Sequence, residues 1–310
     1  MDKEKILELV NAGFSARRIA KITGTPRSTI GRFLRKETHK EWWELRDKGT
    51  IDKAPKLYDT VNVLVLDIET APIMFGGWGM WNQNYSLEQI HEDWTIISFS
   101  AKWVGDDEVF YYDATDYSEL ELLQFLWGML SDAHFVIAHN GRRFDMKKIR
   151  ARMILNGLKP YSPVRVIDTL EIAKKEFGFT SNKLQYLTSS LCKSHVKSSH
   201  GNFAGYLLWK EFLKGNQEAI DEMREYNQID VLSLEELYFI LAPWSSSLPN
   251  FDVYTDEELD MSEWVEEDYW YTNLGKYRMY RNVNTGQFKR GRVNLLTTEK
   301  RKQLLANIIC

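Results

Sequence analysis

The sequence predicts an α/β fold in which helices flank both faces of a mixed β-sheet. The first observation is an apolar, β-branched run over residues 61–70 (VNVLVLDIET), which is typical of a buried strand. The second is the order of the patterns that follow this run, because they alternate between strand and helix. The third is a composition of 44% hydrophobic and 27% charged residues in a chain of 310, as in an ordinary globular protein.

The first 40 residues predict a small domain of three helices, followed by a linker over residues 41–58. Ser15 is suited to cap the second helix, Gly24 to make a tight turn, and Pro26 to open the third helix. This pattern resembles the helix-turn-helix of resolvases and many regulators, whose third helix lies in the major groove of DNA. The residues that the third helix would then present to DNA are Arg27, Ser28, Thr29 and Arg32. A helical bundle that binds protein is the alternative.

The central domain is expected over residues 59–245. Its strands are predicted at residues 61–70, 95–103, 107–113, 134–140 and 164–169. Helices are predicted at residues 119–130 and 144–155, and further helices continue to about Leu241. Three strands followed by helix, strand, helix and strand suit a mixed sheet that is covered on both faces.

A segment rich in glycine and tryptophan, residues 72–94, follows the first strand directly. Its composition suits a mobile lip beside that strand. We interpret Trp78 and Trp81 as core residues, and stacking on a nucleic-acid base is the alternative.

The net charge of −4 is distributed unevenly. Residues 1–50 hold 12 Lys and Arg against 7 Asp and Glu. An acidic linker is predicted over residues 246–268, because positions 252–268 hold nine acids and no base. A basic C-terminal extension, residues 269–310, holds nine Lys and Arg and one acid. The basic ends are expected to contact a polyanion, and plain solvated surfaces are the alternative.

The number of cysteines and the length of the apolar runs indicate the cellular compartment. Cys192 and Cys310 are too few and too far apart for a disulfide framework or a structural zinc site. The sequence has no apolar run near the roughly 20 residues of a membrane span, and no signal peptide is expected. These features predict a cytoplasmic protein, or one of the host cytoplasm if it is viral, with no membrane partner.

Carboxylates stand at three points of the predicted domain. Asp67 and Glu69 lie two residues apart at the end of the first strand, so both side chains leave the same face. Such a pair repels unless a cation neutralises it, and carboxylate oxygens favour Mg²⁺ or Mn²⁺. Asp145 falls in the first turn of the helix that follows a strand, near the carboxyl edge of the sheet. Tyr226 and Asp230 are four residues apart and share one helix face.

The motifs VLDIET, HNGRRFD and YNQID resemble the three motifs of the DEDD superfamily of exonucleases, in the branch that carries Tyr in the third motif. That superfamily has a ribonuclease-H-like fold and includes polymerase proofreading domains and stand-alone phage and bacterial nucleases. The resemblance covers about residues 60–245 and keeps the order and spacing of the motifs. It implies a 3′–5′ exonuclease in which two Mg²⁺ or Mn²⁺ ions are held by Asp67, Glu69, Asp145 and Asp230.

The resemblance also implies roles for residues beside the carboxylates. Tyr226 would hold the attacking water, and Asn140 and Gly141 would lie beside the terminal nucleotide. Asp168 matches an Asp that is common in the family, and a helix N-cap is the alternative.

Nucleic acid is therefore the expected partner, with DNA favoured over RNA, and replication or repair proteins are further candidates. A recombinase or transposase is one alternative, because such proteins also join a helix-turn-helix to a ribonuclease-H-like domain. Their third carboxylate is typically Glu, without the Tyr226 and Asp230 pattern found here. A catalytically silent DNA-binding protein is the other alternative.

Overall fold

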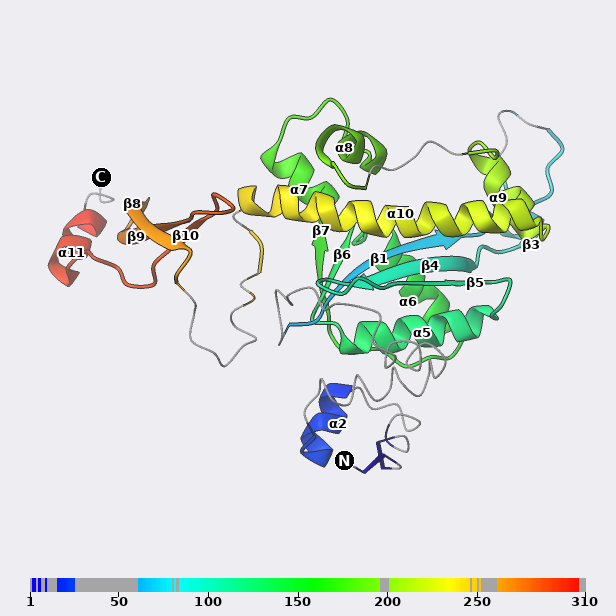
Figure 1. The fold of residues 1–310 in the computed structure, drawn as a ribbon, viewed down its shortest axis with the longest axis horizontal. Coiled ribbons are helices and arrows are strands. Elements are labelled where there is room, and N and C mark those ends of the chain that lie inside the picture. Colours follow the sequence, from blue (N-terminus) through cyan, green and yellow to red (C-terminus); the bar gives the residue numbers. More distant parts are fainter. Residues whose placement is uncertain are drawn as a thin grey trace. The chain divides into compact units, whose positions relative to one another are not determined.

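The computed structural model describes residues 2–3, 5–6, 9, 16–25, 61–79, 81, 84–195, 201–245, 247–249, 251 and 261–306 (Figure 1). The chain divides into two compact units, Met1–Ile240 and Leu241–Cys310.

A five-stranded mixed sheet forms the centre of the first unit. Its strands are β1 (Val63–Thr70), β4 (Ile96–Trp103), β5 (Val109–Asp113), β6 (Phe135–Ala138) and β7 (Arg165–Asp168). They lie in the order β5-β4-β1-β6-β7, so β1 is central. Strand β1 pairs antiparallel with β4 and parallel with β6. The predicted mixed α/β sheet is confirmed, and each predicted strand matches an observed one within three residues at either end.

Helices cover both faces of this sheet (Figure 1). They are α5 (Glu119–Asp132), α6 (Asp145–Leu155), α7 (Thr169–Glu176), α8 (Leu184–Leu191), α9 (Tyr206–Leu213) and α10 (Gln217–Leu241). On β1, Leu64, Leu66 and Ile68 pack into one apolar core with α5 and α6. Successive side chains of a strand alternate between its faces, so Asp67 and Glu69 point away from that core, toward the layer of α10. Of the helices that the structure describes, none is long and apolar enough to cross a membrane.

The segment after β1 folds on itself beside the sheet. It contains β2 (Met74–Phe75), a 3₁₀ turn η1 (Leu87–Gln89) and β3 (Ile90–Glu92), with β2 antiparallel to β3. The Ala71 N–H donates to the Thr95 carbonyl over 2.8 Å, which closes the segment at its base. The rings of Phe75 and Tyr85 lie 3.9 Å apart, centroid to centroid, and pack within the segment.

Near the N-terminus the structure describes helix α2 (Ala16–Thr23) and the turn that ends it. Gly24 has φ +66°, a left-handed conformation that favours glycine, and its N–H donates to the Ala20 carbonyl. The predicted second helix and its turn thus agree with the described part. The predicted DNA-contacting residues lie outside the described residues: Arg27, Ser28, Thr29 and Arg32.

The second unit contains a three-stranded antiparallel sheet of order β10-β9-β8. Its elements are η2 (Ala242–Trp244), β8 (Trp264–Thr272), β9 (Gly275–Asn282), β10 (Phe288–Arg290) and α11 (Thr298–Ala306). Strand β8 begins within the stretch that the sequence assigns to an acidic linker. Aromatic residues give this strand its β propensity, and the guanidinium of Arg278 pairs with the carboxylate of Glu266 across the strands.

Candidate active site

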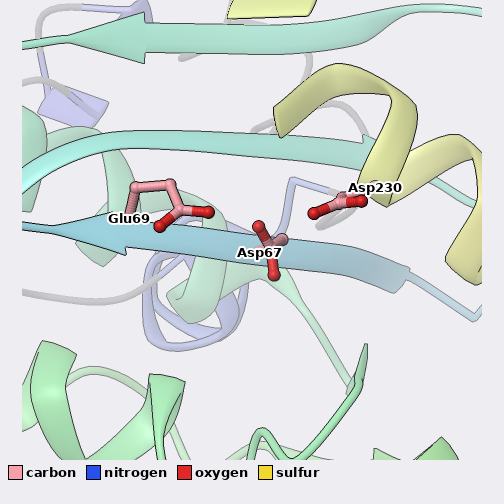
Figure 2. Close-up of side chains that lie close together, drawn as sticks. All are labelled: Asp67, Glu69 and Asp230. Atoms are coloured by element: carbon pink, nitrogen blue, oxygen red, sulfur yellow. The ribbon is translucent and has the colours of Figure 1, made fainter. Parts of the chain in front are cut away.

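Three carboxylates from distant parts of the sequence meet above the central strand. Asp67 and Glu69 project from β1, and Asp230 projects from α10, which crosses that face of the sheet (Figure 2). One ligand oxygen from each of the three lies within 4.8 Å of the others. Asp67 and Glu69 are partly exposed, whereas Asp230 is buried. Negative charges this close repel one another, so the cluster favours a cation between them.

A buried amide holds the first of these carboxylates in place. Asn227, which is fully buried on α10, donates from Nδ2 to Oδ2 of Asp67 over 2.6 Å. Its own Oδ1 has no hydrogen-bond partner among the described residues. The sequence motifs did not predict this role for Asn227. The one local signal was its position three residues before Asp230, which places both on one helix face.

Asp145, the remaining predicted carboxylate, lies outside the group of three. It opens α6, is 3% exposed, and accepts a hydrogen bond from the Ile68 N–H at Oδ1 over 3.3 Å. Strand β6 pairs with β1 only as far as Val65. The Ile68 N–H lies beyond that pairing, so it donates to the Asp145 carboxylate instead of to a carbonyl of β6. Burial raises the pKa of Asp145 to about 7, and the negative charge of Asp168 contributes to the rise.

The turn between β6 and α6 delivers Asp145 to this position. Gly141 is required there, because a Cβ atom on it would lie 2.3 Å from the Cβ of Ala138. Asn140 adopts φ +65°, a conformation that Asn tolerates better than most residues. The buried carboxylate of Asp168 accepts from the N–H groups of Asn140, at 2.8 Å, and Arg142, at 3.2 Å.

Asp168 also caps a helix. It is the N-cap residue of α7 and accepts from the Leu170 N–H over 3.1 Å, so the helix-cap interpretation of this residue is confirmed. The same side chain therefore links α7 to the turn that carries Asn140 and Gly141.

Tyr226 lies one helical turn before Asp230 on α10. Burial raises the pKa of the Tyr226 hydroxyl above its ordinary value, and the charges of Asp230, Glu69 and Asp67 raise it further. Its ring lies 6.1 Å from that of Trp209, in an edge-on arrangement. The hydroxyl therefore keeps its proton at neutral pH and can act as a hydrogen-bond donor.

The two tryptophans beyond β1 do not belong to the core. Trp78 is 99% exposed and Trp81 is 80% exposed, so the interpretation of both as core residues is wrong. Gly76 and Gly77 pack closely inside the segment, where Cβ atoms would meet the side chains of His91 and Tyr85 at 2.7 and 2.6 Å. This close packing leaves no room for Trp78 and Trp81, and both lie in solvent.

The donor set fits a hard divalent cation. Carboxylate oxygens are the ligands that Mg²⁺ and Mn²⁺ prefer, and three of them converge here with a fourth carboxylate beside the same strand. A single bound cation would also offset the mutual repulsion of Asp67, Glu69 and Asp230.

The sheet order and this cluster define a ribonuclease-H-like α/β protein. The chain belongs to the RNase_H superfamily, whose family model matches residues 87–242, half of the sequence. The match includes Asp145, Tyr226 and Asp230, and the structure places β1 with Asp67 and Glu69 beside them.

Comparison with solved structures finds the family B DNA polymerase from the hyperthermophilic archaeon Pyrobaculum calidifontis. The two are 15% identical over 63% of this chain and 27% of the polymerase chain, with a TM-score of 0.42. No curated protein matches the sequence. Membership of the superfamily gives the fold class, and the three converging carboxylates form a group that could hold a metal ion.

Proposed function

We propose that the chain is a 3′–5′ exonuclease that uses two Mg²⁺ or Mn²⁺ ions and acts on DNA in preference to RNA. One observation carries the proposal: carboxylate oxygens of Asp67, Glu69 and Asp230 lie within 4.8 Å of one another on a ribonuclease-H-like sheet. Asp145 is joined to the same strand through the Ile68 N–H, between the two carboxylates of β1.

The four carboxylates would hold the ions, which supply an acidified water and stabilise the leaving 3′ oxygen when they are bound. Tyr226 keeps its proton, so it orients the water by a hydrogen bond and does not act as a base. Asn227 fixes the rotation of the Asp67 carboxylate by donating a hydrogen bond to its Oδ2. The turn of Asn140 and Gly141, held by Asp168, would lie beside the terminal nucleotide.

End-labelled DNA and RNA oligonucleotides, incubated with and without Mg²⁺, test the proposal. A 3′–5′ exonuclease shortens a 5′-labelled strand into a ladder and releases label from a 3′-labelled strand at once. EDTA should abolish both. Fragments from internal cuts would identify an endonuclease, and joined strands would identify a recombinase or transposase.

Matched variants assign the activity to the cluster. Asp67→Asn removes one charged ligand with little change in shape, so we expect a rate at least about a hundredfold lower. Glu225→Gln removes a charge from the exposed side of the same helix and should keep the wild-type rate. Near-normal activity of a folded Asp67→Asn protein would remove the site from consideration, and inactivity of the wild type with every substrate would favour the silent DNA-binding protein.

A further inference from the structure

One face of the sheet in the C-terminal unit combines exposed aromatic rings with cations. Residues that stand opposite each other on paired strands share a face. Tyr271 stands opposite Lys276, and Tyr269 stands opposite Arg278, so these four share one face. Tyr280 continues that face along β9, and Lys289 of β10 stands opposite it. We call this the tyrosine face, and its defining residues are Tyr269, Tyr271, Lys276, Arg278 and Lys289.

The two tyrosines of this face are open to solvent and close together. Tyr271 is 65% exposed and Tyr269 is 39% exposed. Their ring centroids lie 6.4 Å apart. The ammonium of Lys276 lies 3.6 Å from the centroid of the Tyr269 ring and 5.8 Å from that of Tyr271. A positive charge is therefore held beside both rings.

Charge distinguishes the tyrosine face from the opposite face. On the tyrosine face, Glu266 is the one acid among the paired positions, and it is bound to Arg278. Lys276 and Lys289 add two further positive charges to this face. The opposite face places Arg281 and Arg290 with two acids, Glu267 and Asp268, so its charges balance.

We propose that the tyrosine face binds single-stranded nucleic acid, with bases stacked on Tyr269 and Tyr271 and phosphates paired with Lys276 and Lys289. Aromatic rings on a sheet, flanked by cations, suit unpaired bases because every base offers a flat face to a ring. A duplex keeps its bases stacked inside the helix, so it cannot use the tyrosines in this way. Such binding rests on the proposed function and deepens it, because it names the form of nucleic acid that the enzyme holds.

Binding of the full chain in EDTA tests the inference without any hydrolysis. The probe is a fluorescent oligothymidylate of about 20 nucleotides, long enough for several contacts, and fluorescence anisotropy gives its Kd. Loss of one stacking ring should raise the Kd of Tyr271→Ala roughly 5- to 100-fold. Tyr271→Phe keeps the ring and should bind like the wild type. Lys276→Gln should lower the slope of log K against log salt by about 0.7, the value for one phosphate on a single strand.

Controls distinguish binding at the tyrosine face from binding elsewhere on the chain. Phe288→Ala removes an exposed ring from the other face of the sheet, where Phe288 pairs with Arg281 of β9. This variant should leave the Kd unchanged. Kd for a duplex of the same length should be the same in Tyr271→Ala as in the wild type. The inference is overturned if Tyr271→Ala binds the oligothymidylate normally, or if Phe288→Ala weakens binding equally. Binding is measured without metal, so this result is independent of whether Mg²⁺ later supports hydrolysis.

Discussion

Replacing Asn227 by Ala tests how the structure prepares Asp67 for a cation. The substitution removes the 2.6 Å hydrogen bond from Nδ2 of Asn227 to Oδ2 of Asp67. A hydrogen bond to a charged group contributes about 1.5–3 kcal/mol. Partners that orient a metal ligand typically change metal affinity by about 10- to 100-fold, which corresponds to about 1.4–2.7 kcal/mol. The two ranges agree, so we expect Asn227→Ala to weaken Mn²⁺ binding by about one to two orders of magnitude.

We expect Asn227→Ala to change the free energy of unfolding in the absence of metal less than it changes the free energy of Mn²⁺ binding. The same substitution removes Oδ1 of Asn227, a buried oxygen that has no hydrogen-bond partner among the residues described. Burying such an atom costs about 1–3 kcal/mol, and its removal offsets part of the lost hydrogen bond. Asp67 itself is partly exposed and can take water in place of the amide.

Calorimetric titration of Mn²⁺ in the absence of nucleic acid measures the affinity, and urea unfolding in EDTA measures the stability. Ser233→Ala is a matched control, because Ser233 is fully buried on the same helix and donates to the backbone carbonyl of Asp230. It should change stability but keep Mn²⁺ affinity. Wild-type Mn²⁺ affinity in Asn227→Ala, or an equal loss of affinity in both variants, would refute this role for Asn227.

Three further predictions concern other parts of the chain. Tyr226→Phe should lower the single-turnover rate roughly 10- to 1,000-fold with unchanged Mn²⁺ and oligonucleotide affinity; full activity would make Tyr226 a packing residue. The folded-state pKa of Asp145, about 7, lies above its ordinary 3.8, so without metal the free energy of unfolding should fall by up to about 4 kcal/mol as pH rises from 4 to 7. Asp145→Asn should abolish that fall in urea unfolding, and an unchanged pH dependence would contradict the assignment. Deleting residues 1–50 should raise the Kd for duplex DNA and reduce its salt dependence, while hydrolysis of a saturating short oligonucleotide persists; wild-type duplex affinity would reassign this segment to protein contacts.

The sheet was predictable because each strand carries its own local signal. Residues 61–70 are apolar and β-branched, and β1 occupies 63–70. The spacing of Asp67 and Glu69 placed both side chains on one face by strand geometry alone. The same reasoning failed for Trp78 and Trp81, because hydrophobicity does not reveal that the base of their segment is already filled.

Contacts between distant residues were beyond local patterns. The amide of Asn227 meets Asp67 across 160 residues of sequence, and Asp145 meets the Ile68 N–H across 77. In both contacts, the sequence around one partner has no periodicity or composition that identifies the other partner. The charge run over positions 252–268 predicted a solvated linker, yet its last five residues begin strand β8, where Glu266 pairs with Arg278 of the neighbouring strand.

Protonation and cation binding compete for the same negative charge in the proposed site. Burial makes ionised Asp145 costly, and its raised pKa means that a proton removes much of this cost near neutral pH. A cation held by Asp67, Glu69 and Asp230 would remove the cost differently, by placing positive charge beside the same strand. We therefore expect a bound cation to favour release of the Asp145 proton, and protonation of Asp145 to weaken cation binding. The hydrogen bond from the Ile68 N–H ties Asp145 to the strand that carries the other two carboxylates, so we expect the two equilibria to be coupled.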